Sequence, residues 1–201
     1  MPRPDRPAAG IEPRVGEVNL RPALGVLATG FAIVAIVSFV SLAWPQALAS
    51  TLLGTLMIAG AEVDARTFLL PDTVTLGALI GGILAAAVLD PFDPADSAGE
   101  ASARALGTAA MLLLVRWSYA RLRGREGLGL GDIKLAAAIG AWLPLDAIPI
   151  CFAVASSAAL ILVLFARVRG RPLEAATKLP FGAFLCPALW LVFYATVFPF
   201  P

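Results

Sequence analysis

The strongest constraint on this chain is the length of its charge-free apolar segments. A helix needs about 20 predominantly apolar residues, within a range of about 17–25, to cross a bilayer. Five segments come near that length, and 105–115 reaches it if the arginines at its ends extend to the interface. The segment 135–145 is short, and we expect a short or partly re-entrant helix buried by its neighbours, which we count as one of about seven spans. The seven segments are 23–44, 46–61, 73–89, 105–115, 135–145, 147–166 and 179–201.

The composition supports a membrane bundle. Hydrophobic residues make up 59% of the chain and charged residues 14%, against about 45–50% and about 25% in ordinary soluble domains. These values exclude a disordered chain and disfavour a soluble enzyme. The net charge of +1 gives no field that attracts nucleic acid. We expect an all-α, polytopic transmembrane helical bundle, with residues 1–22 as a cytoplasmic tail, 23–201 embedded in the membrane, and the lipid bilayer, not nucleic acid, as a partner.

Two absences narrow the chemistry. The chain contains no histidine, which excludes a Ser-His or Cys-His nucleophile, a histidine-ligated metal and an H-E-x-x-H zinc helix. Its two cysteines, Cys151 and Cys186, lie far apart inside apolar segments and form no C-x-x-C pair. We interpret them as small core residues. We therefore expect no metal and no cofactor.

The distribution of positive charge predicts the orientation in the membrane. Short cytoplasmic loops retain Lys and Arg. Arg104 falls on one side of the predicted bilayer together with Asp90, Asp93, Asp96 and other acids, whereas every other Lys and Arg falls on the opposite side. We expect the N-terminus in the cytoplasm and the C-terminus outside.

Asp64 is the first of two acids that need a reason. An ionisable group within a spanning helix costs about 2.5–3.5 kcal/mol at mid-bilayer and less near the surface. Asp64 ends the second apolar region, where the helix macrodipole disfavours negative charge by about 0.3–1 kcal/mol. A purely structural carboxylate is not usually placed there. The alternative is a solvated boundary residue paired with Arg66.

Asp132 is the second such acid, and it closes the sequence Gly-Leu-Gly-Leu-Gly-Asp at 127–132. Because Asp is a favoured helix N-cap, a capping role is the alternative interpretation. Three alternate glycines exceed what one turn needs, and Gly129 and Gly131 permit close approach of a substrate or a positive φ beside the carboxylate. A phosphate-binding loop is disfavoured, because Asp stands where G-K-[ST] is required.

The predicted topology brings Asp64 and Asp132 to the same membrane boundary, where they can meet. Two adjacent carboxyls tend to share one proton, so one acts as base on water and the other as acid toward a carbonyl or leaving amine. That chemistry hydrolyses peptides without histidine or metal. Three further residues are supporting candidates. Lys134 holds one carboxylate ionised, contacts lipid headgroups or is a boundary lysine whose side chain extends to the interface. Glu62 is a supporting or pore-facing acid, and Asp72 caps the third segment.

Three separated motifs resemble those of the type IV prepilin peptidases, membrane aspartyl proteases of the GxGD type. Residues 64–72, Asp-Ala-Arg-Thr-Phe-Leu-Leu-Pro-Asp, resemble the first motif, in which a Leu/Ile-Pro-Asp/Asn turn follows the catalytic Asp. Residues 129–135, Gly-Leu-Gly-Asp-Ile-Lys-Leu, resemble G-x-G-D-x-K-L. Residues 179–185, Leu-Pro-Phe-Gly-Ala-Phe-Leu, resemble the late P-F-G-P-F-L segment.

The resemblance implies a multi-pass endopeptidase of the bacterial inner membrane with Asp64 and Asp132 as its catalytic pair. Such an enzyme removes the short basic leader from prepilin or pseudopilin precursors of type IV pili or type II secretion systems, at the cytoplasmic face. Ala183 stands where the family often has proline, a departure that concerns only the local backbone. Bifunctional members carry an additional N-terminal helix and paired C-x-x-C motifs, which nothing in this sequence matches. We therefore expect a short form without methyltransferase activity.

Two other functions stay open at this point. An ion-coupled membrane transporter would also use intramembrane acids. Transport sites usually lie near the bilayer midplane between repeated halves, whereas Asp64 and Asp132 are predicted at one edge. An inactive assembly protein of a pilus or secretion system differs from the peptidase only in lacking activity.

Overall fold

The computed structural model describes residues 20–124, 129–169 and 179–199, and within these residues the regular structure is entirely helical. The predicted all-α fold is therefore confirmed. The predicted tail at 1–22 lies almost wholly outside the described residues. The seven helices are α1 (Leu24–Ser41), α2 (Trp44–Thr67), α3 (Asp72–Leu89), α4 (Pro94–Arg123), α5 (Leu130–Trp142), α6 (Ala147–Val168) and α7 (Phe181–Val197).

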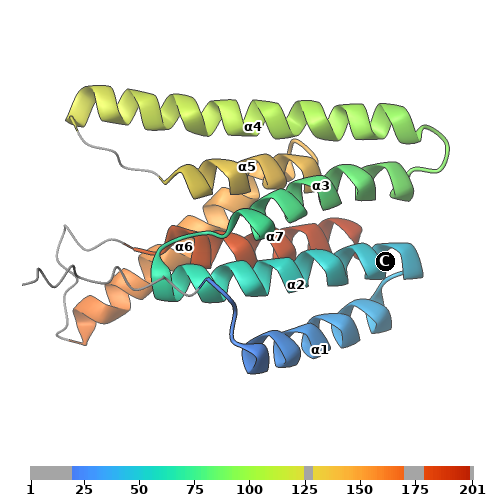
Figure 1. Cartoon of the computed structure of the whole chain (residues 1–201), viewed down its shortest axis with the longest axis horizontal. Helices are drawn as coiled ribbons and strands as arrows, with labels where there is room; N and C mark the ends of the chain where they lie inside the picture. The colour runs from blue at the N-terminus through green and yellow to red at the C-terminus, as the bar shows by residue number, and fades with distance from the viewer. Residues whose placement is uncertain (1–19, 125–128, 170–178, 200–201) are drawn as a thin grey trace, which may run out of the picture.

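The helices lie alongside one another and alternate in direction (Figure 1). The α2–α3 turn, the end of α4 and the starts of α5 and α7 lie at the left of the view. We call this the motif end and define it by residues 64–72, 129–134 and 179–183, which belong to the three motifs. The α1–α2 and α3–α4 connections lie at the opposite, distal end.

Five of the helices, α1, α2, α3, α4 and α6, are long and apolar enough to cross a membrane by length and composition. Helix α7 is a shorter apolar helix of 17 residues. Helix α5 has only 13 residues, a rise of about 20 Å, which falls short of a hydrocarbon core of about 30 Å. It packs against α3, α4 and α7, and its second half is buried. The expected short, buried fifth helix is thus observed.

Helices α4 and α5 begin well before the charge-free segments that predicted them. Helix α4 has 30 residues, from Pro94 to Arg123, and Gly124 is its left-handed C-cap with φ 65°. Proline suits the first turn of a helix and glycine its C-terminal cap. Asp96, expected in an external loop, lies in the first turn of α4. Helix α5 starts at Leu130 instead of 135, so Asp132 and Lys134 are helical.

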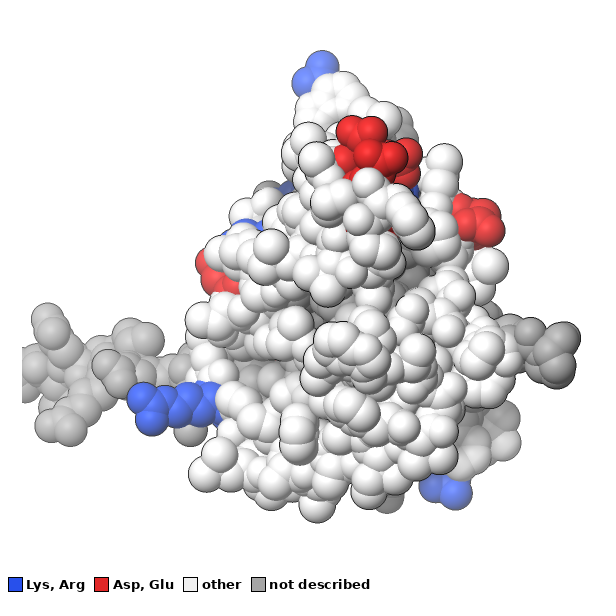
Figure 2. All heavy atoms as spheres, turned by 90° about the vertical axis from the view of Figure 1, so that its right-hand side faces the viewer, with Lys and Arg blue, Asp and Glu red and all other residues white. Residues whose placement is uncertain are grey.

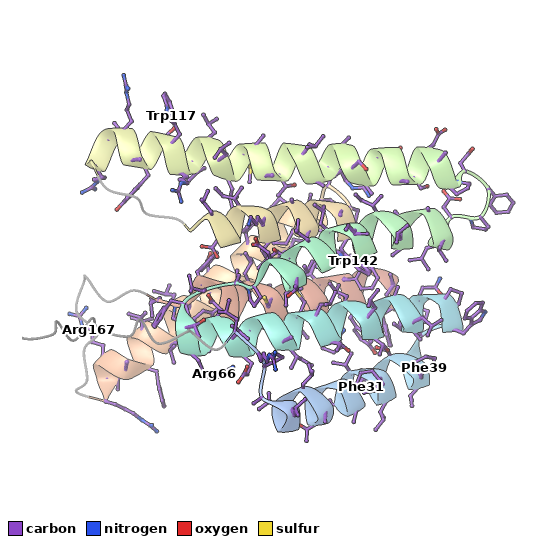
Figure 3. The ribbon with its side chains drawn as sticks, viewed as in Figure 1. Phe31, Phe39, Arg66, Trp117, Trp142 and Arg167 are labelled. Carbon is purple, nitrogen blue, oxygen red and sulfur yellow. The ribbon has the colours of Figure 1, made fainter. Side chains whose placement is uncertain are left out.

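Large apolar side chains cover the outer surface of the bundle. Phe31 and Phe39 on α1 point outward, whereas Trp142 points in among the helices (Figure 3). Lipid-facing helices require such outward apolar faces. Asp and Glu side chains appear on the distal end (Figure 2), where Asp90 and Asp93 flank the α3–α4 connection.

Candidate active site

Asp64 lies in the last turn of α2 and is turned into the protein, with 5% of the residue exposed. Its Oδ2 accepts a hydrogen bond of 2.8 Å from the backbone N–H of Ala183, in the first turn of α7. The first N–H groups of a helix have no partner within it, and they favour a negative charge. The unfavourable position of Asp64 at the end of its own helix is therefore offset by the beginning of another.

The alternative in which Asp64 pairs with Arg66 is wrong. Arg66 forms an ion pair with Glu62, one turn earlier on the same helix, with 2.7 Å between Arg66 Nε and Glu62 Oε1. Its Nη2 also donates to the carbonyl of Arg21 at 2.9 Å, just before α1. Residues 62 and 66 thus lie on one face of α2, toward α1, while Asp64 faces α7. Glu62 partners a basic residue of its own helix.

Asp132 is the third residue of α5 and is half-buried. Its Oδ2 accepts a hydrogen bond from the backbone N–H of Gly129, at 3.3 Å. The N-cap residue of α5 is Gly129, not Asp132. The alternative interpretation of Asp132 as the N-cap residue is therefore wrong. Asp132 instead supplies the reciprocal part of a capping box, in which the third helical side chain reaches back to the N-cap N–H.

The structure brings Asp64 and Asp132 to the same end of the bundle, on α2 and α5 (Figure 1). The two side chains interact electrostatically. The three motifs meet here, because the N-terminus of α7 holds Asp64 while the first turn of α5 carries Asp132. Such a pair of carboxyl groups has the chemistry that peptide hydrolysis needs, with one group as base toward water and the other as acid toward a carbonyl.

The glycines at the site serve close packing. An ideal Cβ added to Gly131 would lie 3.1 Å from Leu70 Cβ, so glycine lets the turn between α2 and α3 approach closely, whereas the expected approach of a substrate stays a prediction. Gly129 has φ −71°, and among the described glycines a positive φ is found at Gly124. The expected positive φ at Gly129 and Gly131 is therefore wrong. Gly127 of the same motif lies outside the described residues.

Gly182 is a site residue that sequence reasoning missed. A Cβ there would lie 2.9 Å from Asp64 Oδ2, so glycine leaves the space that the carboxylate fills. The N–H of Ala183 was equally missed. The only signal in the sequence was the Leu-Pro-Phe-Gly motif itself, which carries no acidic or nucleophilic side chain.

Lys134 and Asp72 contact each other. Lys134 Nζ lies 2.5 Å from Asp72 Oδ1 and joins α5 to the start of α3. Asp72 is the first residue of α3, whose N-cap is Pro71 without a side-chain cap, so the expected capping role is wrong. Both side chains are more than 40% exposed, and such a pair contributes about 0–1 kcal/mol. The pair therefore contributes little to stability, although it connects the first two motifs.

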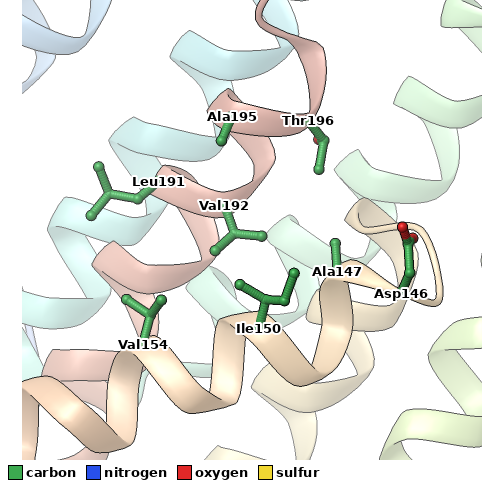
Figure 4. A pocket seen from close by; sticks show the side chains of 8 residues that line it. All are labelled: Asp146, Ala147, Ile150, Val154, Leu191, Val192, Ala195 and Thr196. Carbon is green, nitrogen blue, oxygen red and sulfur yellow. The ribbon is translucent and has the colours of Figure 1, made fainter.

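Other chemical groups lie apart from this site. Among the described residues, no group of three or more Cys, Asp or Glu side chains is arranged to hold a metal. Cys151 and Cys186 are both buried and free. A hollow of about 480 Å³ lies between α6 and α7 (Figure 4), and neither Asp64 nor Asp132 lines it. It is lined by Asp146, Ala147, Ile150, Val154, Leu191, Val192, Ala195 and Thr196.

Fold and site together define a polytopic helical membrane protein with two interacting carboxyl groups at one end. Residues 51–164, which include Asp64 and Asp132, match the type IV leader peptidase family. The chain belongs to this family. With its bacterial relatives and its five candidate spans, it is a multi-pass protein of the bacterial inner membrane.

Individual relatives agree with the family. A prepilin leader peptidase/N-methyltransferase of Dickeya chrysanthemi is 42% identical over 128 residues, covering 61% of this chain and 43% of the relative. One of the same name from Aeromonas hydrophila is 33% identical over 174 residues, covering 87% and 58%. The leader peptidase HopD of Escherichia coli is 38% identical over 130 residues, covering 64% and 81%. The chain thus spans about half the length of the first two. No solved structure matches it significantly.

Proposed function

We propose that this protein is a membrane aspartyl endopeptidase that cleaves the basic leader from prepilin or pseudopilin precursors. The observation that carries the proposal is the meeting of Asp64 and Asp132 at one end of the bundle, on helices that are not adjacent in the chain. The names of the relatives, prepilin leader peptidase and leader peptidase, support the choice of substrate.

The proposed reaction needs one carboxylate and one protonated carboxyl. The carboxylate takes a proton from water, whose oxygen attacks the carbonyl carbon of the scissile peptide. The protonated carboxyl donates its proton to the carbonyl oxygen. As the C–N bond breaks, the carboxyl that took the proton from water passes it to the leaving amine, and the hydroxyl of the tetrahedral intermediate returns its proton to the other carboxylate. The N–H of Ala183 holds Asp64 in orientation, and Gly129 does the same for Asp132.

Cleavage at the cytoplasmic face is supported by the charges at the motif end. Arg66 and Lys134 lie within the two aspartate motifs, and Arg121 and Arg123 lie in the last turn of α4 at the same end (Figure 1). Positively charged residues beside spanning helices are retained on the cytoplasmic side. A basic leader that also stays in the cytoplasm would reach the carboxyl pair there.

The test is the replacement of each carboxyl by an amide. We expect Asp64→Asn and Asp132→Asn each to lower leader cleavage by at least about 100-fold, because an amide can serve neither as base nor as acid. The enzyme variant is expressed with a pilin precursor that carries a basic leader, a glycine and an apolar helix, and cleavage is followed by gel mobility.

The matched control is Asp96→Asn, an exposed acid in the first turn of α4 at the distal end. It should cleave at the wild-type rate, and immunoblots should show equal amounts of all variants in the membrane. Near-normal cleavage by either motif variant would remove that aspartate from the mechanism. Absence of cleavage by the wild type would favour the inactive assembly protein.

The transporter alternative is not favoured by the family match, nor by the position of both acids at one end. Methylation of the new N-terminus lies outside this proposal. From the sequence we expect that this chain, acting alone, has no methyltransferase activity, and this stays a prediction.

A further inference from the structure

Leu70 lies in the short turn between α2 and α3, inside the first motif but without any chemical group that the proposed reaction needs. Its side chain is half-buried and packs against the main hydrophobic core of the bundle. Glycines of the other two motifs, Gly131 and Gly182, lie close to it. A residue with this location can control how the motifs meet.

On one side, Leu70 packs on the element that carries Asp132. An ideal Cβ on Gly131 would lie 3.1 Å from Leu70 Cβ, 3.6 Å from its Cδ1 and 3.8 Å from its Cγ. The leucine side chain therefore lies directly against the backbone that precedes Asp132.

On the other side, Leu70 packs on the element that holds Asp64. An ideal Cβ on Gly182 would lie 2.7 Å from Leu70 Cδ1 and 2.9 Å from Asp64 Oδ2. The leucine methyl group and the carboxylate thus lie side by side over the same glycine, next to the N–H of Ala183 that binds Asp64. The other methyl group, Cδ2, points toward Gly60, one turn before Asp64 on α2.

The turn that presents Leu70 has a constrained backbone. Phe68 adopts φ 56° and ψ 26°, the left-handed region that non-glycine residues rarely occupy, and its N–H donates to the carbonyl of Asp64 at 2.8 Å. The N–H of Leu69 donates to Thr67 Oγ1 at 3.3 Å. Pro71, which has a fixed φ, is buried. Leu70 is therefore held between two anchored residues.

We propose that Leu70 is a positioning residue that sets the separation between the Asp64 and Asp132 carboxyl groups. The proposal rests on the proposed peptidase function. Two carboxyls share a proton and bind one water only at a suitable separation, and small misplacements of reacting groups are costly. Removing the leucine methyl groups leaves space into which the first turns of α5 and α7 can shift.

The experiment compares four variants of the full chain in proteoliposomes. Leu70→Ala should lower kcat about 10–100-fold while KM changes less than about 3-fold, and it should change the pH–rate profile. Leu70→Val should give a kcat between those of Leu70→Ala and the wild type. It is the variant to measure if Leu70→Ala does not accumulate in the membrane. Leu70→Met fills the same space with a flexible side chain and should restore kcat to within about 3-fold of wild type. The matched control is Leu69→Ala. Leu69 precedes Leu70 in the chain, is 51% exposed, and its replacement should leave kcat unchanged.

A second measurement does not depend on catalysis. Spin labels are attached through Leu130→Cys and Leu179→Cys, at positions 59% and 37% exposed, while the native Cys151 and Cys186 are fully buried. Leu70→Ala should shift or broaden the distance distribution between the labels, and Leu69→Ala should not.

The proposal is overturned if Leu70→Ala keeps wild-type kcat and pH–rate profile, or if the label distances stay unchanged. It is also overturned if Leu70→Met is as impaired as Leu70→Ala. If the wild type cleaves no precursor, the proposed function fails, and the label distances still decide whether Leu70 separates α5 from α7.

Discussion

At the scale of single residues, the site depends on backbone groups as much as on acidic side chains. Asp64 is buried at a helix end that disfavours its charge, and one backbone N–H from α7 compensates. That hydrogen bond exists because Gly182 has no side chain where the carboxylate lies. A glycine that contributes no chemical group is thus necessary for the geometry of a carboxylate that does.

Gly182→Ala tests this dependence. Its Cβ would lie 2.9 Å from Asp64 Oδ2 and 2.7 Å from Leu70 Cδ1, so the carboxylate must move. We expect leader cleavage to fall about 10–100-fold, although alanine favours a helix by about 1 kcal/mol over glycine. The matched control is Gly99→Ala on α4, where no atom lies within 4 Å of the new Cβ. Unchanged cleavage by Gly182→Ala would show that Asp64 does not need this position.

At the scale of helices, α5 shows how a short segment can hold a reactive group in place. Its distal part is fixed by two hydrogen bonds to backbone carbonyls. Trp142 Nε1 donates to Ala78 of α3 at 2.6 Å, and Arg104 Nε donates to Leu143 at 3.1 Å. At its other end the Lys134–Asp72 ion pair joins α5 to α3 again. The helix that carries Asp132 is therefore anchored to its neighbours at both ends.

Trp142→Phe removes the bond to Ala78 and leaves a smaller ring against Phe193, whose centroid lies 5.0 Å from that of Trp142. We expect the free energy of unfolding in mixed micelles to fall by about 1–2 kcal/mol, since a buried carbonyl loses a partner. Trp117→Phe on α4, 60% exposed, is the matched control and should change it by less than about 0.5 kcal/mol. Equal stability of the two variants would mean that the Trp142 bond does not anchor α5.

At the scale of the whole molecule, basic side chains are concentrated at the motif end of the bundle. The motif end carries Arg66 and Lys134 beside the carboxyl pair, and the distal end carries Asp90 and Asp93. Asp90 stabilises the α3–α4 connection, because its carboxylate accepts hydrogen bonds from Ser97 Oγ and from the N–H of Phe92. The Ser97 bond holds the pKa of Asp90 below its usual value. Asp90 thus has structural partners separate from the proposed chemistry.

The predicted orientation is tested with topology reporters. Fusions after Phe68 and after Gly124, at the motif end, should report the cytoplasm, whereas a fusion after Phe92 should report the external side. Alkaline phosphatase and a cytoplasmic fluorescent protein give opposite signals, so each position is measured twice. A cytoplasmic signal after Phe92 would place both ends of α3 and α4 on one side and contradict the alternating bundle.

The sequence by itself determined the class of fold and the two candidate acids. Apolar length and charge placement depend on local composition, so they predict seven helices and their approximate positions without knowledge of packing. Apolar length did not predict that α4 starts at Pro94 and α5 at Leu130. The first turns of these helices contain polar and charged residues, so they are helical without being apolar. The motifs singled out Asp64 and Asp132 because acids at such places need a reason.

Only the tertiary structure decided the partners of those acids. Asp64 binds a backbone N–H 119 residues away, and Lys134 pairs with an acid 62 residues away. Arg66 turns to Glu62 and leaves Asp64 to α7. Sequence patterns report which side chains share a helix face, but hydrogen-bond partners across helices depend on how closely the backbones approach. That approach is set by small residues such as Gly131 and Gly182, whose effect appears only when the helices are packed.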